Sequence, residues 1–293
     1  MSDILIKVLG TAQDGGYPQP GCNCPNCEQV RKDKSLIRYP ASIAVLDKKE
    51  RKSYLIDPTP HLPEQLERLN KEAGKLNFPD NHLKEILITH AHIGHYTGLM
   101  YFGKEAISSQ ELTVRGSSRL KEFLSTNQPW QTLVENNNIA INIFIFGEPI
   151  YSDKSFNITP VKVPHRAEFT DTAGFLIEGS NKSLFYLPDI DSWQGFEPKF
   201  NEISAKTDYL LIDGTFYSKD ELGELRGRSI EDVPHPPISK TIQQLKKGNL
   251  EQNKSEIYFT HFNHTNRVLD PEFKNEDKNN KMFFLTEDEK FEL

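Results

Sequence analysis

Short apolar runs separated by amphipathic segments fill most of the chain. Across residues 139–146 the isoleucines fall at every second position, which is the pattern of a strand with one strongly apolar face. Similar short runs elsewhere are typical of buried strands. The predicted strands are Ile4–Leu9, Ser42–Leu46, Ser53–Ile56, Glu85–Thr89, Ile139–Phe146, Ile158–Val163, Ala173–Ile177, Ser183–Leu187, Tyr209–Ile212 and Ile257–Thr260.

Helices are predicted where the apolar residues take a helical spacing. The segments Leu62–Leu69 and Ile238–Leu245 repeat leucine or isoleucine at i, i+4 and i+7, and Leu120–Leu124 suggests a third helix. Gly248 offers an end to the second of these. Strands thus come in runs with helices between the groups. This order favours an α/β (α+β) protein with two packed mixed sheets covered by helices over a single parallel Rossmann sheet.

The composition is that of one globular protein. Of the 293 residues, 36% are hydrophobic and 26% are charged, and no shift in composition marks a domain boundary. We therefore expect a single domain over residues 1–293, in which the polar stretch Lys274–Lys281 is a loop. The net charge of −7 argues against nucleic acid held by bulk electrostatics but permits a small anionic substrate.

The apolar runs also bear on location. None approaches the ~18 residues of a membrane span, so no membrane partner is expected. Asp3 and Lys7 bracket the first apolar run, which therefore lacks the length of a secretory signal. The sequence predicts a cytoplasmic protein.

A cluster of histidines follows the apolar run Ile86–Ile88. It reads Thr89-His90-Ala-His92-Ile-Gly94-His95. Imidazoles at i and i+2 of an extended loop can converge on one ion, and the next, at i+5, can turn toward a neighbouring ion. Zinc, iron and manganese all accept imidazole nitrogen. A histidine-rich surface loop is the alternative, but the strand before it anchors this loop at a sheet edge, where ligands bind.

Three further predicted strands end in a side chain that can bind a metal. His165 follows one strand, Asp189 follows the next, and His261 follows the last. Each is a weak signal alone, because a single histidine is more often a hydrogen-bonded structural residue than a ligand. Their shared position at strand ends makes a common metal site a much stronger hypothesis.

The three cysteines, Cys22, Cys24 and Cys27, lie together in Cys-Asn-Cys-Pro-Asn-Cys. An odd number within six residues does not make a disulfide framework, whereas clustered thiolates are typical zinc ligands. Three reduced buried thiols are the alternative. A structural zinc is four-coordinate, so a fourth ligand must come from elsewhere in the chain.

The order His-x-His-x-x-His, His, Asp, His resembles the metallo-β-lactamase fold superfamily over most of the chain. More narrowly, the chain is similar to the pyrroloquinoline quinone biosynthesis protein B family, and it shares its cysteine cluster and its His-x-x-His ending with the phosphonate-pathway cyclic phosphodiesterase. The resemblance implies a four-layer αββα sandwich that carries a zinc loop at residues 22–27. The pieces that match are Lys7–Ala12, Gly15–Cys27, Ala41–Ala44, Tyr96–Leu99, Leu211–Phe216 and His261–Asn266.

The resemblance also implies the ligand sets, with one or two divalent ions (Zn, Fe or Mn) at a catalytic site. His264 would close the structural zinc site with the cysteines. His235 is the rival for that role, but we favour His235 as a pocket residue that donates a proton or contacts substrate. Asp57 would be structural. The first ion would be held by His90, His92 and His165, the second by His95 and His261, and Asp189 would bridge the two.

One position departs from the superfamily pattern. The usual motif has an aspartate just before the third histidine, where this chain has Gly94. Glycine has no ligand atom, so we expect a weaker second site, and we expect the variant Gly94→Asp to gain one ion.

The leading hypothesis for function is a metal-dependent hydrolase in which a metal-bound hydroxide attacks an ester- or phosphodiester-type bond. The resemblance equally permits a non-haem iron oxygenase that acts on a peptide-derived quinone precursor, or a non-catalytic metal-containing carrier. The expected partner is a small-molecule or peptide-derived substrate, and a homodimer is left open.

A few polar residues have no settled role at this point. His61 and His82 are expected at the surface. Asp14, Tyr17 and Arg166 are candidates for lining the site. Asp213 has either a pocket role or a turn role, because Asp-Gly favours turns.

Overall fold

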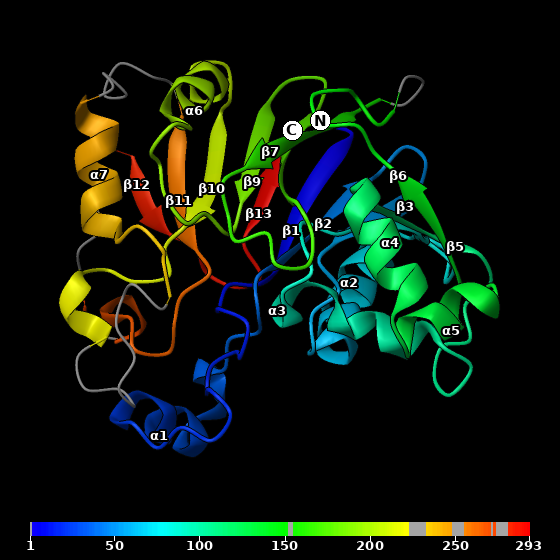
Figure 1. Cartoon of the computed structure of the whole chain (residues 1–293), viewed down its shortest axis with the longest axis horizontal. Coiled ribbons are helices and arrows are strands. Elements are labelled where there is room, and N and C mark those ends of the chain that lie inside the picture. The colour runs from blue at the N-terminus through cyan, green and yellow to red at the C-terminus, as the bar shows by residue number, and fades with distance from the viewer. Residues whose placement is uncertain (1, 152–154, 223–232, 248–254, 271, 274–280) are drawn as a thin grey trace.

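The strands form two mixed sheets that pack face to face (Figure 1). The structure is a computed structural model and describes residues 2–151, 155–222, 233–247, 255–270, 272–273 and 281–293. The seven-stranded sheet has the order β13 (Lys290–Glu292), β1 (Ile4–Gly10), β2 (Ser42–Asp47), β3 (Lys52–Ile56), β4 (Leu83–Leu87), β5 (Leu112–Gly116), β6 (Ile139–Ile143). The six-stranded sheet has the order β12 (Met282–Phe284), β11 (Glu256–Thr260), β10 (Tyr209–Asp213), β9 (Ser183–Leu187), β8 (Thr172–Glu178), β7 (Asn157–Val163).

Helices cover the outer faces of both sheets. In Figure 1, α2, α4 and α5 lie on one side of the molecule and α6 and α7 lie on the other, while α1 projects at the bottom. The α-helices are α1 (Pro25–Lys32), α2 (Leu62–Lys75), α3 (Ile93–Tyr96), α4 (Ser118–Thr126), α5 (Trp130–Glu135), α6 (Glu197–Ser204) and α7 (Ile238–Lys247). Short 3₁₀ helices span Lys34–Leu36, Thr97–Phe102, Lys219–Leu222 and Arg267–Leu269.

The alternation along each strand builds three apolar layers. In β1, Ile4 and Ile6 face the second sheet and pack in the core that includes Phe175. Leu5 faces the other way and belongs to the core under α2, which contributes Leu62. Because successive side chains of a strand point to opposite faces, a strand buried on both sides reads as one apolar run.

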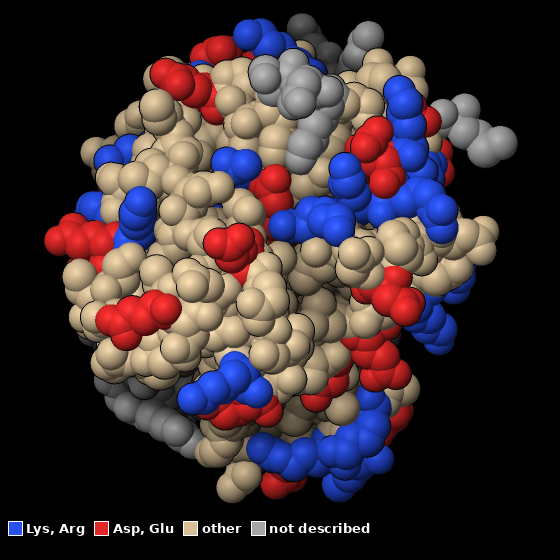
Figure 2. All heavy atoms as spheres, turned by 90° about the vertical axis from the view of Figure 1, so that its right-hand side faces the viewer, with Lys and Arg blue, Asp and Glu red and all other residues tan. Residues whose placement is uncertain are grey.

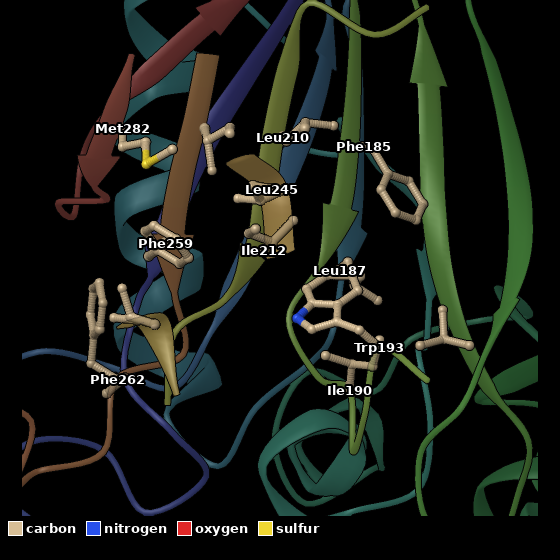
Figure 3. Packing of buried hydrophobic residues seen from close by; sticks show 14 of the residues in the cluster. Phe185, Leu187, Ile190, Trp193, Leu210, Ile212, Leu245, Phe259, Phe262 and Met282 are labelled. Carbon is tan, nitrogen blue, oxygen red and sulfur yellow. The ribbon is translucent and has the colours of Figure 1, made fainter. Parts of the chain in front are cut away.

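The third layer lies between the six-stranded sheet and its helices. Figure 3 shows Phe185 and Leu187 of β9 beside Leu210 and Ile212 of β10, with Leu245 of α7 packed on them. Each such side chain, when fully buried, contributes roughly 1.5–3 kcal/mol. The order helix, sheet, sheet, helix is the four-layer αββα sandwich, so the predicted fold class is confirmed.

Strand direction decides where the loops gather. β1 and β3 run the same way, because each is antiparallel to β2, and β4 is parallel to β3. In the other sheet β9, β10 and β11 are parallel to one another, and β7 shares their direction through the antiparallel β8. The loops that follow these strands therefore lie at the same edge of each sheet, which positions the candidate site.

Some expectations from the sequence need correction. The predicted strand Ile139–Phe146 ends at Ile143, because its partner β5 ends at Gly116, which pairs with Ile143. His82 is buried, not exposed: its Nδ1 lies 2.7 Å from the Ser53 hydroxyl, which satisfies the ring inside the fold. Gly248 and residues 274–280 lie outside the described residues.

The surface carries both signs of charge. On the face shown in Figure 2, which is the right-hand side of Figure 1, basic and acidic side chains lie next to one another. None of the helices in the described part of the chain combines the length and the hydrophobicity needed to cross a bilayer.

Candidate metal centre

The sequence-predicted ligands converge at the carboxyl ends of strands from both sheets. The histidine cluster follows β4, with its third member in the one-turn helix α3, and the other three ligands follow β7, β9 and β11. The residues brought together are His90, His92, His95, His165, Asp189 and His261.

His90, His92 and His165 form the first group. One ring nitrogen of each lies within 4.8 Å of the others, and Nδ1 of His92 is 3.0 Å from Nε2 of His165. The ring centroids of His90 and His92 are 4.5 Å apart at an interplanar angle of 78°, so the rings do not stack. This group could hold one metal ion.

Asp189 lies between the first group and two further histidines. Its Oδ2 is 2.8 Å from Nε2 of His95, 3.3 Å from Nε2 of His261 and 3.8 Å from Nε2 of His90. The side chain is buried at the end of β9. A carboxylate in this position could contact two ions, which is the role that the family resemblance implies for Asp189.

A chain of hydrogen bonds fixes the orientation of His90. The Thr89 hydroxyl donates to the buried Asp57 carboxylate and faces Nδ1 of His90 at 3.0 Å. Because a hydroxyl has one proton, which Asp57 takes, it accepts from Nδ1–H of His90. The Nε2 lone pair of His90 is then left facing the centre. Asp57 also accepts from Nδ1 of His95 at 2.8 Å, which turns Nε2 of that ring inward.

The second sheet repeats the arrangement. The Thr215 hydroxyl donates to Asp213 at 2.8 Å and lies 2.9 Å from Nδ1 of His261. By the same reasoning Nε2 of His261 is left as an acceptor that faces the centre. Sequence reasoning missed both threonines, because each stands next to a strong feature and shows no pattern of its own.

Five of the atoms that face the centre have no hydrogen-bond partner. They are buried, and a buried polar atom without a partner is costly in an ordinary protein interior. Imidazole nitrogens and carboxylate oxygens are the ligands that zinc, iron and manganese accept, so this donor set fits a divalent ion. The atoms are His90 Nε2, His95 Nε2, His261 Nε2, Asp189 Oδ2 and Asp14 Oδ1.

Burial and neighbouring charges shift the pKa values of the groups in the centre. Burial alone would raise the pKa of Asp189, but the rings of His261 and His95 hold it well below its usual range. Burial likewise opposes protonation of His95, yet Asp57 and Asp189 raise its pKa well above the usual value. For His90, burial dominates and lowers the pKa far below the usual value, so its ring is a neutral potential ligand.

The backbone is strained at Asp57, which orients two histidines of the centre, and at His261, a candidate ligand. Asp57 has φ 65° and His261 has φ 63°, in the left-handed region that residues other than glycine seldom adopt. Such conformations persist where the surrounding structure imposes them, and they cluster at functional sites. Both residues turn sharply out of a strand, which points their side chains toward the centre.

Gly94 does not simply leave a gap. The carboxylate of Asp14, in the loop after β1, passes next to it, and Asp14 Oδ1 lies 3.4 Å from Nε2 of His95. A Cβ atom added at Gly94 would lie 2.1 Å from that oxygen. The expected Gly94→Asp variant therefore has no free space for the new side chain.

His235 lies beside the centre and not at the cysteines. Its Nδ1 is 2.6 Å from Asp213 and 3.8 Å from Asp189, and its Nε2 is 3.4 Å from the Arg166 guanidinium. Burial would lower its pKa, but Asp213 raises it above the usual value, so the ring is cationic over a wider pH range. The position agrees with the preference for His235 as a pocket residue.

The rim of the centre is partly exposed. The side chain of His92 is 18% exposed and that of Arg166 is 30% exposed, while His90, His95 and His261 are buried. Of the candidates for lining the site, Asp14 and Arg166 lie there. Tyr17 does not: its hydroxyl donates to the carbonyl of Asn26, which lies between Cys24 and Cys27 in the first turn of α1.

The cysteine cluster meets His264, as the sequence predicts. Nδ1 of His264 lies 3.7, 3.5 and 3.6 Å from the sulfurs of Cys22, Cys24 and Cys27. In a tetrahedral site with Zn–S of about 2.3 Å and Zn–N of about 2.0–2.1 Å, sulfur and nitrogen are about 3.6 Å apart. All three sulfur–nitrogen distances match this value, so the four atoms could hold a zinc ion.

The chain is similar in sequence to a known family and to proteins named for coenzyme synthesis. Residues 52–262 match the beta-lactamase superfamily domain. A protein from Methylococcus capsulatus named "Coenzyme PQQ synthesis protein B" is 27% identical over 91% of this chain and 92% of its own length, and one of the same name from Nitrosococcus oceani is 28% identical over 92% and 93%.

Solved structures confirm the fold. Zn(2+)-bound PqqB from Methylobacterium extorquens aligns over 99% of this chain and 100% of its own with a TM-score of 0.80 and 19% identity. A diphosphatase from the PhnP family aligns over 98% and 96% with a TM-score of 0.67 and 19% identity. Both resemblances predicted from the sequence are thus confirmed, and since the family match covers most of the chain, the protein belongs to the beta-lactamase superfamily.

Proposed function

We propose that this protein is a metal-dependent hydrolase that cleaves an ester- or phosphodiester-type bond. The observation that supports this most directly is the set of buried imidazole nitrogens and carboxylate oxygens that face one another and make no hydrogen bonds. His90, His92 and His165 would hold one ion, His95 and His261 the other, and Asp189 both. When bound, such ions act as Lewis acids and lower the pKa of water toward ~7.

The protein groups around the centre have separate tasks in this proposal. Asp189 is buried between the two groups of histidines, so it would be a ligand shared by both ions. The Asp213 carboxylate lies next to Nδ1 of His235 and stabilises the protonated ring. Nε2 of His235 lies next to Arg166. From there Nε2–H would donate a proton to the leaving group, as a general acid does.

The charge at the rim favours an anionic substrate. Arg166 lies against Nε2 of His235, so two cationic groups face the same space beside the centre. The Arg166 guanidinium forms an ion pair with Asp191, whose Oδ1 is 3.3 Å from its Nε. A guanidinium binds phosphate or carboxylate oxygens well. The relatives are named for the synthesis of a coenzyme, which favours a small molecule within this class.

We also propose a structural zinc at Cys22, Cys24, Cys27 and His264. The sulfur–nitrogen distances support it, and so do two backbone N–H groups that donate to the sulfurs, from Gln19 to Cys27 and from Cys24 to Cys22. The ion would join the loop before α1 to the residues after β11. It would thereby stabilise the segment that carries His261, three residues before His264 in the sequence.

The test is metal analysis of freshly purified protein, followed by hydrolysis assays with bis(p-nitrophenyl) phosphate, a thioester and a lactam. We expect hydrolysis of the phosphodiester that falls at least 100-fold in Asp189→Asn and about 10²–10⁴-fold in His235→Gln, which removes the proton donor. The exposed variant Asp3→Asn is the matched control and should hydrolyse at the wild-type rate. Oxygen uptake by an iron-loaded protein without hydrolysis would contradict the proposal and favour an oxygenase. An intact metal complement with no turnover on any substrate would favour a carrier.

A further inference from the structure

We propose that Asp14 is a ligand of the second metal ion and replaces the carboxylate that position 94 does not supply. This inference rests on the proposed metal centre. It reverses the expectation of a weak second site, because the site then has two histidines, the bridging Asp189 and a carboxylate of its own. Asp14, which would supply the carboxylate, lies in a different loop, the one that follows β1.

The distances suit a ligand. Asp14, His95 and His261 each offer one atom, and these three atoms lie within 4.8 Å of one another. Asp14 Oδ1 is 3.4 Å from Nε2 of His95, and two ligands of a tetrahedral ion at about 2.1 Å are about 3.4 Å apart. Although the side chain is 31% exposed, Oδ1 itself is buried and makes no hydrogen bond, so it faces the centre without another partner.

The position of Asp14 leaves no room for a side chain at position 94. A Cβ at position 94 would lie 2.1 Å from Oδ1 of Asp14 and 2.6 Å from its Cα. Gly94 has an ordinary helical backbone at the start of α3, so its conformation does not require glycine. What requires glycine is the space that Asp14 occupies. The absence of a side chain at position 94 therefore makes room for the Asp14 carboxylate, which takes the place of the missing aspartate.

The loop that carries Asp14 is fixed against the loop of another ligand. Gln13 N donates to the carbonyl of Phe262 at 2.9 Å, and Phe262 N donates to the carbonyl of Thr11 at 2.8 Å. Phe262 directly follows His261, so these two bonds set the distance between Asp14 and that histidine. A ligand held in place by backbone hydrogen bonds needs little rearrangement to bind an ion.

The test is a titration of metal-free full-length protein with Zn²⁺, followed by calorimetry, with elemental analysis of the ions retained. Asp14→Asn keeps the shape of the side chain and removes the charge. Gly94→Ala removes no ligand atom but places a Cβ where Asp14 lies. Asp3→Asn and Gly74→Ala are the matched controls, because Asp3 is exposed and a Cβ at Gly74 in α2 meets nothing within 4 Å.

We expect the wild type and both controls to bind one ion at the cysteines and two at the histidines. Asp14→Asn and Gly94→Ala should each weaken the second histidine-site ion at least about 100-fold, beyond the 10–100-fold typical of a lost outer partner. Wild-type affinity for that ion in Asp14→Asn would overturn the proposal, as would a wild type that binds one ion at the histidines.

The fold of each variant is checked by circular dichroism and thermal unfolding. Should Gly94→Ala not fold, Asp14→Asn decides the matter alone, since it changes one oxygen to nitrogen at a partly exposed side chain. The result is independent of turnover. A wild type that binds both ions but hydrolyses nothing would refute the proposed function and leave the role of Asp14 standing.

Discussion

The two histidines on opposite sides of Asp189 are oriented by the same chemical device. Asp57 and Thr89 direct His90 from the first sheet, and Asp213 and Thr215 direct His261 from the second. In each case a carboxylate takes the hydroxyl proton, so the hydroxyl must accept from the imidazole. The ring then has its lone pair on the nitrogen that faces the centre. The tautomer of each candidate ligand is thus decided by residues that would not touch an ion.

Replacement of a first-group ligand tests the centre most directly. We expect His90→Ala to lose the first ion, because His92 and His165 alone leave a divalent ion with two of the three imidazoles of that group. Elemental analysis of the purified variant measures the loss. His61→Ala, which alters a histidine outside the centre, should keep every ion. A full metal complement in His90→Ala would refute the assignment.

The orienting carboxylate should matter nearly as much as a ligand. In Asp57→Asn an amide N–H₂ would face Nδ1–H of His95, so donor would meet donor where a bond of 2.8 Å now exists. Asparagine accepts the φ of 65° at this position, which limits the damage to the backbone. We expect zinc affinity at the histidines to fall 10–100-fold.

Calorimetric titration with zinc measures that change, and Asp33→Asn, an exposed carboxylate, is the control. The same fall in both variants would show that the effect is not specific to Asp57. An unchanged affinity in Asp57→Asn would mean that the ring of His95 is held in place by packing alone.

At the scale of the elements, the cysteine cluster lies at the N-terminus of helix α1. Cys24 is the residue before α1, and Cys27 lies in its first turn. A helix N-terminus favours negative charge, so it favours the thiolates that a zinc site needs. In the absence of an ion, burial raises the pKa of Cys27 to about 12, which means that the metal must displace a proton.

Loss of the zinc site should loosen the connection between the N-terminal loop and β11. In Cys24→Ser we expect zinc per chain to fall by one ion. The free energy of unfolding should fall by about 4 kcal/mol when free zinc is about 1,000 times the dissociation constant. Chelator treatment of the wild type, which removes the ions of the histidine centre as well, should lower the free energy of unfolding in urea by at least as much. Lys32→Ala, on the same helix, is the control, and a Cys24→Ser protein that keeps the wild-type number of zinc ions would contradict the assignment.

The sequence predicts the elements whose apolar pattern is strong and misses those that depend on a partner. Strands such as β1 and β9 are buried on both faces, so their runs of Ile, Leu and Phe are visible without a structure. β13 has a single buried residue, Phe291, between two exposed ones, and is a strand because it pairs with β1. Such an edge strand is decided by its neighbour, which no local pattern records.

The same distinction holds at the candidate centre. The ligands at strand ends could be predicted, because each directly follows a strong apolar run. The proximity of Asp14 to Gly94 could not, since it depends on how the loop after β1 lies against α3. The only local signal was a carboxylate in a Gly-rich turn, Gln13-Asp14-Gly15-Gly16, which is equally typical of an ordinary turn.

At the scale of the whole molecule, the C-terminal segment joins the two sheets. β12 pairs with β11 in one sheet, and β13, a few residues later, pairs with β1 in the other. Between them, Glu287 accepts from the backbone N–H of Tyr39 and lies 2.7 Å from the Arg68 guanidinium of α2. This buried carboxylate therefore connects the crossing segment to a loop and a helix of the first sheet.

That connection makes stability depend on pH. Burial raises the pKa of Glu287 from an ordinary 4.5 to about 7, although Arg68 partly opposes the shift. Since the folded pKa is the higher one, the group stabilises the fold fully below pH 4.5, and this contribution is lost as the pH rises through 7. A shift of this size corresponds to about 3 kcal/mol.

We therefore expect the wild type to lose about 3 kcal/mol of unfolding free energy relative to Glu287→Gln between pH 4.5 and pH 7.5. Urea denaturation of both proteins at the two pH values measures the difference, and groups that titrate elsewhere cancel in the comparison. Glu202→Gln, which changes an exposed carboxylate of α6, should follow the wild type. A constant difference between wild type and Glu287→Gln would show that Arg68 keeps the buried carboxylate ionised throughout, and that the crossing segment is held by an ion pair at every pH.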